Sequence, residues 1–364
     1  MLVPKLRFKE FNDEWNNTYI RNIFEERSQK HYQYLELLSV TIDNGVIKRC
    51  EISGKNTSSD DKSNYKLVEI NDIVYNSMRM WQGTSGVSKY KGIVSPAYTI
   101  LKPKININSN FFGYMFKLPN MIYHFRVNSQ GLTSDTWNLK YTQIKDIPIN
   151  LPSLEEQTKI ANFLSLIDRK IELQEKLVEN LKLYKKGLLK KVFSNNLGWK
   201  SAKLGNIFQY EQPNNYIVEN AEYNSNYTIP VLTANKGFIL GYTNETNTYN
   251  KGKCIIFDDF TMDFKYVDFP FKVKSSAIKI LTTKKEYNIN FMYQLLKTIT
   301  LEPISHQRHY ISMVQNIEVT IPSIEEQNRI ANLFTSLDKK IELETKKLQD
   351  LKTYKKGLLQ KMFI

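Results

Sequence analysis

The chain has 364 residues, 41% of them hydrophobic and 12% aromatic, a composition typical of a globular protein and unlike that of a disordered one. This length exceeds what a single core usually supports, so two domains are expected. No run of 18 apolar residues occurs and the N-terminus lacks the apolar core of a signal peptide, which argues against membrane insertion and secretion and favours a cytoplasmic protein. Cys50 and Cys254 have no metal-like spacing and are expected to be reduced.

The formal net charge of +14 indicates a polyanionic partner, and nucleic acid is the simplest choice. The excess of lysine and arginine is distributed over residues 1–150, 151–193, 194–320 and 321–364, and none of these segments is acidic. The charge therefore belongs to the body of the molecule. A scaffold that only spaces two protein-binding heads would leave this charge unexplained.

The two globular parts, residues 1–150 and 194–320, show the same order of predicted elements. Trp15 and the Asn-Ile-Phe tripeptide at 22–24 have counterparts 184 positions later, at Trp199 and 206–208. Four further pairs of segments predict a strand hairpin, a central strand, a short helix and a closing strand in each half: 34–49 with 227–242, 71–76 with 253–258, 111–116 with 291–296, and 144–151 with 314–321. We therefore expect two β-rich α+β domains built on one plan.

A longer segment occurs twice and organises the chain. Residues 151–193 are repeated at 321–363 with a constant offset of 170, and 24 of the 43 aligned positions are identical. Each copy begins Pro-Ser-x-Glu-Glu-Gln, a pattern in which Ser153 or Ser323 caps a helix while Glu156 or Glu326 reaches back to the cap residue. The preceding proline prevents the helix from extending upstream.

Apolar residues then recur about every 3.5 positions, with polar interruptions at Gln174 and Lys185 in the first copy and at Glu344 and Lys355 in the second. The pattern predicts a helix from Leu154 to about position 191, roughly 55 Å long at 1.5 Å per residue, and a matching helix in the second copy. An amphipathic helix of this length needs a partner for its apolar stripe. We expect the two copies to pack together lengthwise.

Loops rich in basic, amide and aromatic side chains are the candidates for DNA contact, because arginine forks onto guanine, asparagine and glutamine onto adenine, and lysine onto phosphate. In the first half they are Asn76, Ser77, Arg79, Gln82, Lys89, Tyr90, Lys91, Arg126 and Gln130. In the second half they are Thr233, Lys236, Thr261, Lys265, His306, Gln307, Arg308, His309 and Tyr310. Trp81 and Trp137 are expected to pack and not to stack on bases. At each position a solvated loop or a core aromatic is the alternative.

The sequence lacks the motifs of a self-contained nuclease or methyltransferase. The run at 252–254, Gly-Lys-Cys, has neither the upstream glycine nor the hydroxyl of a phosphate-binding loop, and no Asp/Asn-Pro-Pro-aromatic tetrapeptide occurs. His306 and His309 have no identifiable third ligand, so no metal site is expected there. Asp258 and Asp259 are better explained by a polar loop than by nuclease carboxylates.

The repeated Leu/Ile-Pro-Ser-x-Glu-Glu-Gln-x-x-Ile-Ala start and Tyr-Lys-Lys-Gly-Leu-Leu-x-Lys-x-Phe end resemble the conserved regions of specificity (S) subunits of type I restriction-modification systems. The alternation of variable and conserved segments is similar too. The resemblance implies an α+β fold with target-recognition domains at 1–150 and 194–320. They are separated by spacer helices at 151–193 and 321–364 that form an antiparallel coiled coil with internal pseudo-two-fold symmetry.

The resemblance also implies a non-catalytic chain that binds double-stranded DNA, each domain reading one half of a bipartite target. The helices then set the gap and dock two modification (methyltransferase) subunits, to which restriction subunits add. S-adenosylmethionine is expected on the modification subunits, ATP and Mg²⁺ on the restriction subunits, and no cofactor on this chain. The docking candidates are large side chains off the helix seam: Leu173, Tyr184, Leu343 and Tyr354.

Overall fold

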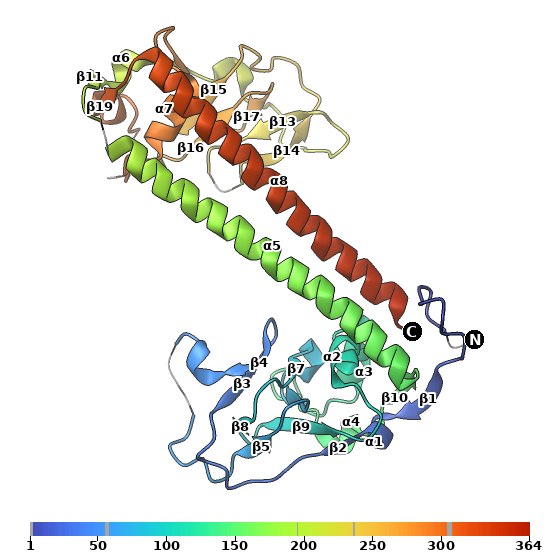
Figure 1. Ribbon diagram of the computed structural model, residues 1–364. Coiled ribbons are helices and arrows are strands. Elements are labelled where there is room, and N and C mark those ends of the chain that lie inside the picture. The colour runs from blue at the N-terminus through green and yellow to red at the C-terminus, as the bar shows by residue number, and fades with distance from the viewer. Residues whose placement is uncertain (1–2, 55–57, 195, 236, 304–307) are drawn as a thin grey trace. The chain divides into compact units, whose positions relative to one another are not determined.

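The computed structural model describes residues 3–54, 58–194, 196–235, 237–303 and 308–364 (Figure 1). The chain divides into two compact units, of which unit 1 comprises Met1–Gln174 with Lys347–Ile364 and unit 2 comprises Glu175–Lys346. Each unit therefore contains one globular domain, the first part of one long helix and the last part of the other. The predicted α+β class, with two domains and two long helices, is confirmed.

Unit 1 is built around a four-stranded antiparallel sheet in the order β2-β9-β6-β7. Smaller pairings join β1 with β10, β3 with β4 and β5 with β8. Its strands are β1 Asn16–Tyr19, β2 Phe24–Glu26, β3 Leu38–Thr41, β4 Gly45–Lys48, β5 Lys66–Val68, β6 Ile73–Asn76, β7 Ser85–Val87, β8 Gly92–Val94, β9 Tyr98–Pro103 and β10 Pro148–Leu151. Its short helices are α1 Ile20–Ile23, η1 Arg49–Glu51, η2 Met80–Gln82, α2 Ser109–Met115, α3 Pro119–Val127 and α4 Tyr141–Ile144.

Unit 2 repeats this plan with the antiparallel sheet β12-β18-β15-β16 and the pair β11-β19, and it adds the sheet β14-β13-β17. Its strands are β11 Lys200–Lys203, β12 Phe208–Glu211, β13 Ile229–Leu232, β14 Ile239–Thr243, β15 Cys254–Asp258, β16 Phe264–Val267, β17 Lys272–Val273, β18 Ile278–Thr283 and β19 Glu318–Ile321. Its short helices are α6 Leu204–Ile207, η3 Asn214–Tyr216, α7 Ile289–Leu296 and η4 Val314–Asn316. The closing strands predicted at 144–151 and 314–321 are shorter than expected. Helix α4 ends at Ile144 and η4 covers Val314–Asn316, so β10 begins at Pro148 and β19 at Glu318.

The long helices α5 (Leu154–Ser194, 41 residues) and α8 (Ile324–Met362, 39 residues) begin where the sequence predicts (Figure 1). In unit 1 the start of α5 shares a core with the end of α8, and in unit 2 the start of α8 shares a core with the end of α5. Within each unit the two helices therefore run antiparallel, as expected.

The Pro-Ser-x-Glu-Glu-Gln motif ties each helix start to the neighbouring domain. In the first copy Ser153 Oγ accepts the backbone N–H of Glu156 at 3.3 Å, which confirms the serine cap. The predicted return bond of the glutamate is wrong, because the Glu156 carboxylate binds the guanidinium of Arg7. Gln157 Oε1 accepts the N–H of Asn108, the N-cap residue of α2, at 3.0 Å.

The second copy makes the equivalent bonds in unit 2. Ser323 Oγ accepts the N–H of Glu326 at 3.4 Å, and Gln327 Oε1 accepts the N–H of Asn288, the N-cap residue of α7, at 2.9 Å. The Glu326 carboxylate binds Arg329 one turn along the helix, so here too the carboxylate is bonded to an arginine and not to the cap residue. The motif is thus a joint between the helix and the domain as well as a cap.

The lysines that interrupt the apolar stripe form cross-helix ion pairs. In unit 1 Lys355 Nζ lies 2.5 Å from Asp168 Oδ1, and in unit 2 Lys185 binds Asp338. In unit 1 the Tyr114 hydroxyl also donates to Asp168 at 2.8 Å, which links the pair to the domain. These pairs fix which residues of α5 and α8 face each other.

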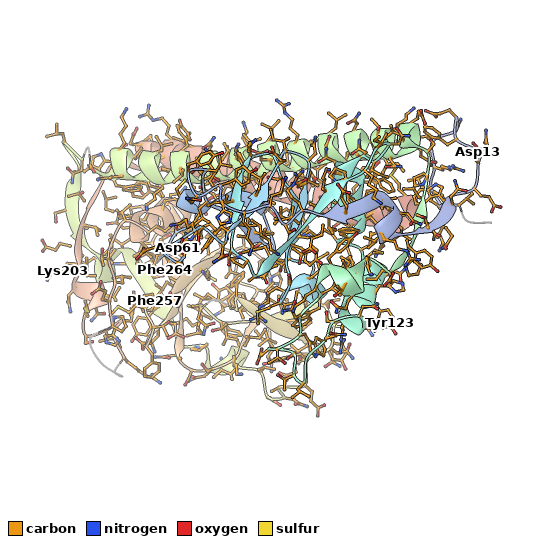
Figure 2. All side chains as sticks on the ribbon, turned by 90° about the horizontal axis from the view of Figure 1, so that it is seen from below. Asp13, Asp61, Tyr123, Lys203, Phe257 and Phe264 are labelled. Carbon is orange, nitrogen blue, oxygen red and sulfur yellow. The ribbon has the colours of Figure 1, made fainter. Side chains whose placement is uncertain are left out.

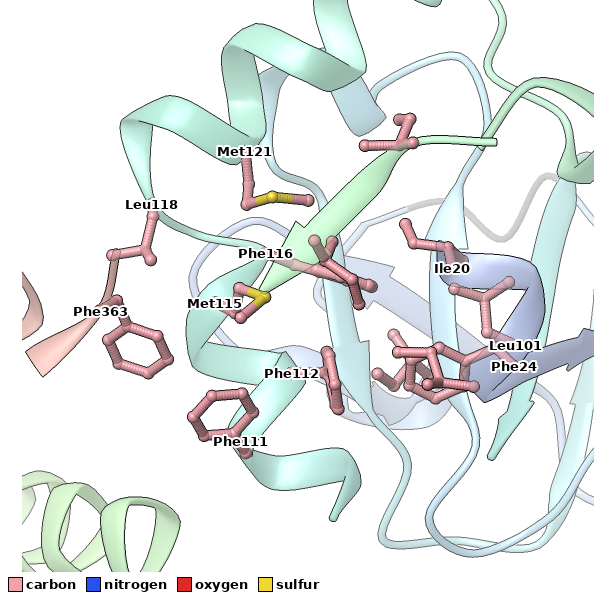
Figure 3. Packing of buried hydrophobic residues seen from close by; sticks show 14 of the residues in the cluster. Ile20, Phe24, Leu101, Phe111, Phe112, Met115, Phe116, Leu118, Met121 and Phe363 are labelled. Carbon is pink, nitrogen blue, oxygen red and sulfur yellow. The ribbon is translucent and has the colours of Figure 1, made fainter. Parts of the chain in front are cut away.

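Each domain core is completed by the end of a helix from the other half of the sequence. In unit 1 the ring of Phe363, which follows α8, lies 5.0 Å from Phe111 (Figure 3) and 6.4 Å from Trp15. In unit 2 the ring of Phe193 occupies the same position, 5.4 Å from Phe291 and 6.1 Å from Trp199. The domains therefore share both their plan and this aromatic cluster.

Candidate nucleic-acid interface

Three loops meet at the end of the central strand β6 in unit 1. The central loop, residues 76–84, begins with Asn76, whose Oδ1 accepts the N–H of Met78 at 3.0 Å. The Ser77 N–H donates to Ala97 O in the β8–β9 loop at 3.3 Å. The Ser77 carbonyl accepts the N–H of Leu139 at 2.8 Å, at the end of the return loop, residues 128–140. Backbone bonds therefore bring segments that lie far apart in the sequence to one place.

Unit 2 has the same three-loop junction at the end of β15. Asp258 Oδ1 accepts the N–H groups of Phe260 and Thr261, each at 2.9 Å, and so shapes the central loop, residues 258–263. The Asp259 N–H donates to Ala277 O at 2.8 Å, and its carbonyl accepts the N–H of His309 at 3.0 Å. His309 is the counterpart of Leu139 at the repeat offset of 170. The junction is therefore a duplicated backbone frame that carries different side chains.

In unit 1 this frame brings together several of the predicted DNA contacts. Arg79 and Gln82 are exposed on the central loop around η2, and Arg126 is exposed on the last turn of α3. The Arg126 guanidinium lies 5.6 Å from the Trp137 ring, which packs edge-on against Trp81 at 5.3 Å. The predicted packing role of the two tryptophans is confirmed. It joins the return loop to the central loop.

The return loop is itself a small hairpin in which Gln130 and Asn138 exchange backbone hydrogen bonds at 3.0 and 2.8 Å. Gln130 is exposed, and its Oε1 accepts a bond from Gln143 at 3.3 Å. Tyr123, in the middle of α3, is also exposed (Figure 2). The predicted group Arg79, Gln82, Arg126 and Gln130 thus lies on adjoining loops and the end of α3.

Other predicted residues of unit 1 have structural partners. Ser77 is buried and its Oγ lies 2.8 Å from Thr99 Oγ1, so the prediction that its side chain contacts DNA is corrected: it holds the junction. Asn76 is half-buried, with its side chain engaged in the turn described above. The structure places both at the base of the central loop.

The remaining unit 1 candidates lie at the other end of β7, in the β7–β8 turn. Lys89 is exposed, whereas the half-buried ring of Tyr90 packs on the core beneath β3 and β4. Lys91 forms an ion pair with Glu69 at 2.8 Å, and this bond raises the pKa of Lys91. This turn therefore lies at the opposite end of β7 from the three-loop junction.

In unit 2 Thr261 and Arg308 are exposed and flank the junction, since both adjoin residues bonded to Asp258 or Asp259. Lys265 is half-buried on β16, and Thr233 is buried at the end of β13, where its N–H donates to Phe238 O at 3.0 Å. The prediction for the Thr233 side chain is therefore corrected to a core position. Lys236, His306 and Gln307 lie outside the described residues.

His309 and Tyr310 are core residues, which corrects their prediction as DNA contacts. His309 Nδ1 lies 3.1 Å from Asp259 O. The Tyr310 ring is fully buried, 5.7 Å from Phe257 and 5.4 Å from Tyr210, and burial raises the pKa of its hydroxyl. Aromatic and imidazole groups near Arg308 therefore anchor the loop and leave the arginine at the surface.

The acidic pair of unit 2 has a structural role. Asp259 Oδ1 accepts the N–H of Tyr310 at 2.7 Å, and Asp259 Oδ2 lies 3.4 Å from the buried Lys279 ammonium. Asp258 caps the central loop. Among the residues that the structure describes, no group of three or more histidine, cysteine, aspartate or glutamate side chains is arranged to hold a metal ion.

A polar cavity of about 200 Å³ opens at the unit 1 junction, and sequence reasoning missed the residues that give it its character. Lys66, Asn138 and Lys140 line it beside Ser77. Burial lowers the pKa of Lys66, whose Nζ donates to Tyr98 O at 2.8 Å. The signal for Asn138 was present in the repeat, because this residue is the counterpart of Arg308 at offset 170.

The predicted docking residues lie exposed on the long helices. Unit 1 carries Leu173 and Tyr354, and unit 2 carries their repeat counterparts Leu343 and Tyr184, all of them more than half exposed. Their positions off the helix seam agree with the sequence pattern. That they bind a partner stays a prediction.

A family model described as type I restriction modification DNA specificity domain matches residues 12–183 and again residues 196–353. The two matches correspond to the two halves of the repeat and together cover most of the sequence. The chain belongs to this family. Among the described residues, no helix has the length and apolarity needed to cross a membrane.

Individual relatives carry names of the same kind. The chain is 46% identical over 126 residues to the Escherichia coli type I restriction enzyme EcoR124I/EcoR124II specificity subunit, an alignment covering 33% of this chain and 31% of that one. It is 23% identical over 342 residues to a putative MjaX specificity subunit of Methanocaldococcus jannaschii, covering 82% and 79%. The chain thus aligns with only about a third of the E. coli relative. All these names describe specificity subunits, in agreement with the non-catalytic interpretation.

Two solved structures share the fold. The type I restriction-modification S subunit from M. genitalium matches with a TM-score of 0.66 at 18% identity, covering 100% of this chain and 99% of that one. A chain from a study of complex assembly and conformational transition of the type I R-M system matches with a TM-score of 0.55 at 13% identity, covering 96% and 97%. These likenesses confirm the architecture over the whole length of the chain.

Proposed function

We propose that this family member is the specificity subunit of a type I restriction-modification complex and that each unit reads one half of a bipartite double-stranded DNA target. The observation that carries the proposal is the duplicated junction. The same backbone bonds recur at Ser77 and Asp259, yet the exposed side chains around them differ. Two domains that share one backbone frame but expose different contact residues suit a DNA target whose two halves differ in sequence. Since its binding target is cellular DNA, the chain would act in the cytoplasm.

The chemistry of the exposed residues supports base and phosphate contact. Unit 1 offers Arg79, Arg126 and Lys140, and unit 2 offers Thr261 and Arg308. A guanidinium can make two hydrogen bonds to guanine in the major groove, whereas lysine and threonine serve phosphates. The net charge of +14 adds attraction for the DNA backbone, and binding should weaken steeply as salt is raised.

Matched arginine variants test the two-reader proposal. The complex is reconstituted with its modification subunits, and the methylated sites in a genomic DNA substrate are mapped by sequencing. Arg79→Ala should relax only one half of the target and Arg308→Ala only the other, each by about 1–3 kcal/mol of discrimination. Lys203→Ala, an exposed position on β11, serves as the control and should leave the target unchanged (Figure 2). If either arginine variant changed both halves, or neither variant changed any, the proposal would be wrong.

We further propose that the long helices set the gap between the two half-sites. The proposal is supported by the length of α5, whose 41 residues extend about 60 Å, and by the ion pairs that fix the helix register. Seven residues inserted at equivalent points of both helices preserve the heptad pattern and add about 10 Å. The gap should lengthen by about three base pairs at 3.4 Å each. An unchanged gap in a folded variant refutes the spacer role.

Finally, we propose that the exposed Leu173–Tyr354 and Leu343–Tyr184 patches dock two modification subunits, with restriction subunits adding to that complex. In this proposal S-adenosylmethionine belongs to the modification subunits, and ATP with Mg²⁺ to the restriction subunits. Leu343→Glu should then reduce the number of bound modification subunits from two to one, measured by mass photometry. Ile105→Glu, at another highly exposed apolar side chain, is the matched control and should retain both. Two bound subunits with Leu343→Glu would place the docking surface elsewhere.

A further inference from the structure

The N-terminal segment of the chain covers a groove between the long helices in unit 1. The Leu6 N–H donates to Lys361 O at 2.8 Å, so the segment is bonded to the end of α8. Arg7 makes a bidentate bond to Glu156, with Nε donating to Oε1 at 2.8 Å and Nη2 to Oε2 at 2.7 Å. The Phe8 ring lies edge-on to Phe163 of α5 at 5.8 Å. The Arg7 and Phe8 side chains thus occupy this groove, whereas Leu6, which is 41% exposed, is held by its backbone.

The repeat gives unit 2 a second copy of the groove walls. Glu156, Lys159 and Phe163 of α5 correspond to Glu326, Arg329 and Leu333 of α8 at offset 170. In unit 2 these counterparts line an open groove of about 530 Å³. Its main lining residues are Leu188, Val192, Trp199, Glu326, Arg329 and Leu333.

The counterparts in unit 2 are more exposed because the N-terminal segment has no equivalent there. In unit 1 residues 3–14 precede Trp15, whereas in unit 2 Trp199 comes directly after the end of α5. The Glu156 side chain is accordingly 1% exposed and that of Glu326 34% exposed. Leu333 is 47% exposed, an unusual degree for a leucine beside a domain core. Among the described residues, the second groove therefore has walls and no cover.

The residues of the second groove suit the same kind of occupant. In unit 1 the Lys159 ammonium lies 4.9 Å from the Phe8 ring, a cation–π contact that Arg329 can reproduce. The Glu326 carboxylate binds the largely exposed Arg329, three residues along the same helix, and such exposed pairs are weak. An incoming guanidinium can replace that bond with a bidentate one, as Arg7 does at Glu156.

We propose that the unit 2 groove binds an extended segment of a partner polypeptide that carries an arginine–aromatic pair like Arg7-Phe8. The aromatic side chain covers Leu333, as Phe8 packs on Phe163, and the arginine binds Glu326. The site is separate from the Leu343–Tyr184 patch, and it requires no DNA. The first groove, filled by the chain itself, supplies the chemistry of the missing occupant.

A labelled peptide with the sequence of residues 3–11, Val-Pro-Lys-Leu-Arg-Phe-Lys-Glu-Phe, tests the proposal in trans by fluorescence anisotropy with the full chain. We expect saturable binding to one site, weakened at least tenfold when the peptide arginine is replaced by alanine. Glu326→Gln and Leu333→Glu in the protein should each weaken binding at least tenfold. Leu177→Glu, at an exposed leucine of α5 in unit 2, should have no effect, and thermal unfolding verifies that each variant folds.

A full chain with Arg7→Ala and Phe8→Ala provides an independent measurement. Loosening the N-terminal segment should expose the first groove and raise the peptide stoichiometry from one towards two. Binding that is absent, or that Glu326→Gln and Leu333→Glu leave unchanged, overturns the proposal. A dimer of the chain that Leu333→Glu dissociates would also overturn it, because the occupant would then be a second copy.

Discussion

Replacing Phe363 with alanine should destabilise unit 1 and leave unit 2 largely unaffected, although Phe363 is the next-to-last residue of the chain. Its ring is buried between Trp15 and Phe111, at centroid distances of 6.4 and 5.0 Å. Phenylalanine-to-alanine changes in cores cost about 3–5 kcal/mol. Because Phe363 lies at the edge of this core, beside the exposed Ile364, water can reach the space, and we expect the lower end of this range, about 3 kcal/mol.

The expected effect is large enough to resolve by calorimetry. For a unit of this size each kcal/mol lowers the melting temperature by about 2–4 °C, so the unit 1 transition should fall by about 6–12 °C. Hydrogen exchange localises the effect: α2, which carries Phe111, should lose protection, while α7 in unit 2 should keep it. Phe193→Ala, the repeat counterpart, should show the reverse pattern. Unchanged α2 protection in Phe363→Ala, or equal losses in α2 and α7, would refute the assignment of this residue to the unit 1 core.

Three further changes test individual features of the frame. Burial lowers the pKa of Lys117 from 10.5 to about 8, so between these pH values the folded chain binds fewer protons than the unfolded chain. The free energy of unfolding should therefore rise with pH over this window, relative to that of Lys117→Met. Parallel pH profiles of the two proteins in denaturation experiments would contradict this. Lys355→Asp should lower the free energy of unfolding by about 1 kcal/mol or less in thermal denaturation, since the Lys355–Asp168 pair is partly exposed. Adding Asp168→Lys should restore that stability, whereas a second, additive loss would exclude the pairing. Gly86→Ala would place a Cβ 2.7 Å from the Gly45 backbone and should destabilise unit 1 by about 1–3 kcal/mol, a cost that an unchanged melting temperature would rule out.

The frame of the fold was predictable because the chain contains it twice. Positions related by an offset of 170 gave the helix starts, and the capping serines Ser153 and Ser323 are found in their predicted role. The glutamate of the same motif was mispredicted. A local rule assigns Glu156 to its own helix end, but the Arg7 guanidinium, 149 positions away, offers a charged bidentate partner that a backbone N–H cannot match. Such long-range partners leave no periodic trace in the sequence.

The candidate interface was predictable at the level of loops and not of individual side chains. Arg79 and Arg308 are exposed as expected, since a guanidinium is rarely buried without a partner. Tyr310 gave the opposite outcome, because a tyrosine in a polar loop suits both a DNA contact and a core, and only the tertiary packing against Phe257 decides. The same ambiguity explains His309, whose imidazole lies against the Asp259 carbonyl.

The duplicated junction also explains how a specificity domain can change what it reads without losing its fold. The bonds that hold the loops at Ser77 and Asp259 are donated and accepted by backbone N–H and carbonyl groups. These groups are present whatever side chains the loops carry, so the exposed residues Met78, Arg79 and Gln82 can vary while the junction persists. Side-chain oxygens also contribute: Asn76 and Asp258 cap the turn, Ser77 Oγ bonds to Thr99, and Asp259 Oδ1 accepts the Tyr310 N–H. Substituting the exposed loop residues should therefore alter recognition at little cost in stability, whereas Asn76→Ala and Asp258→Ala should loosen the loops themselves.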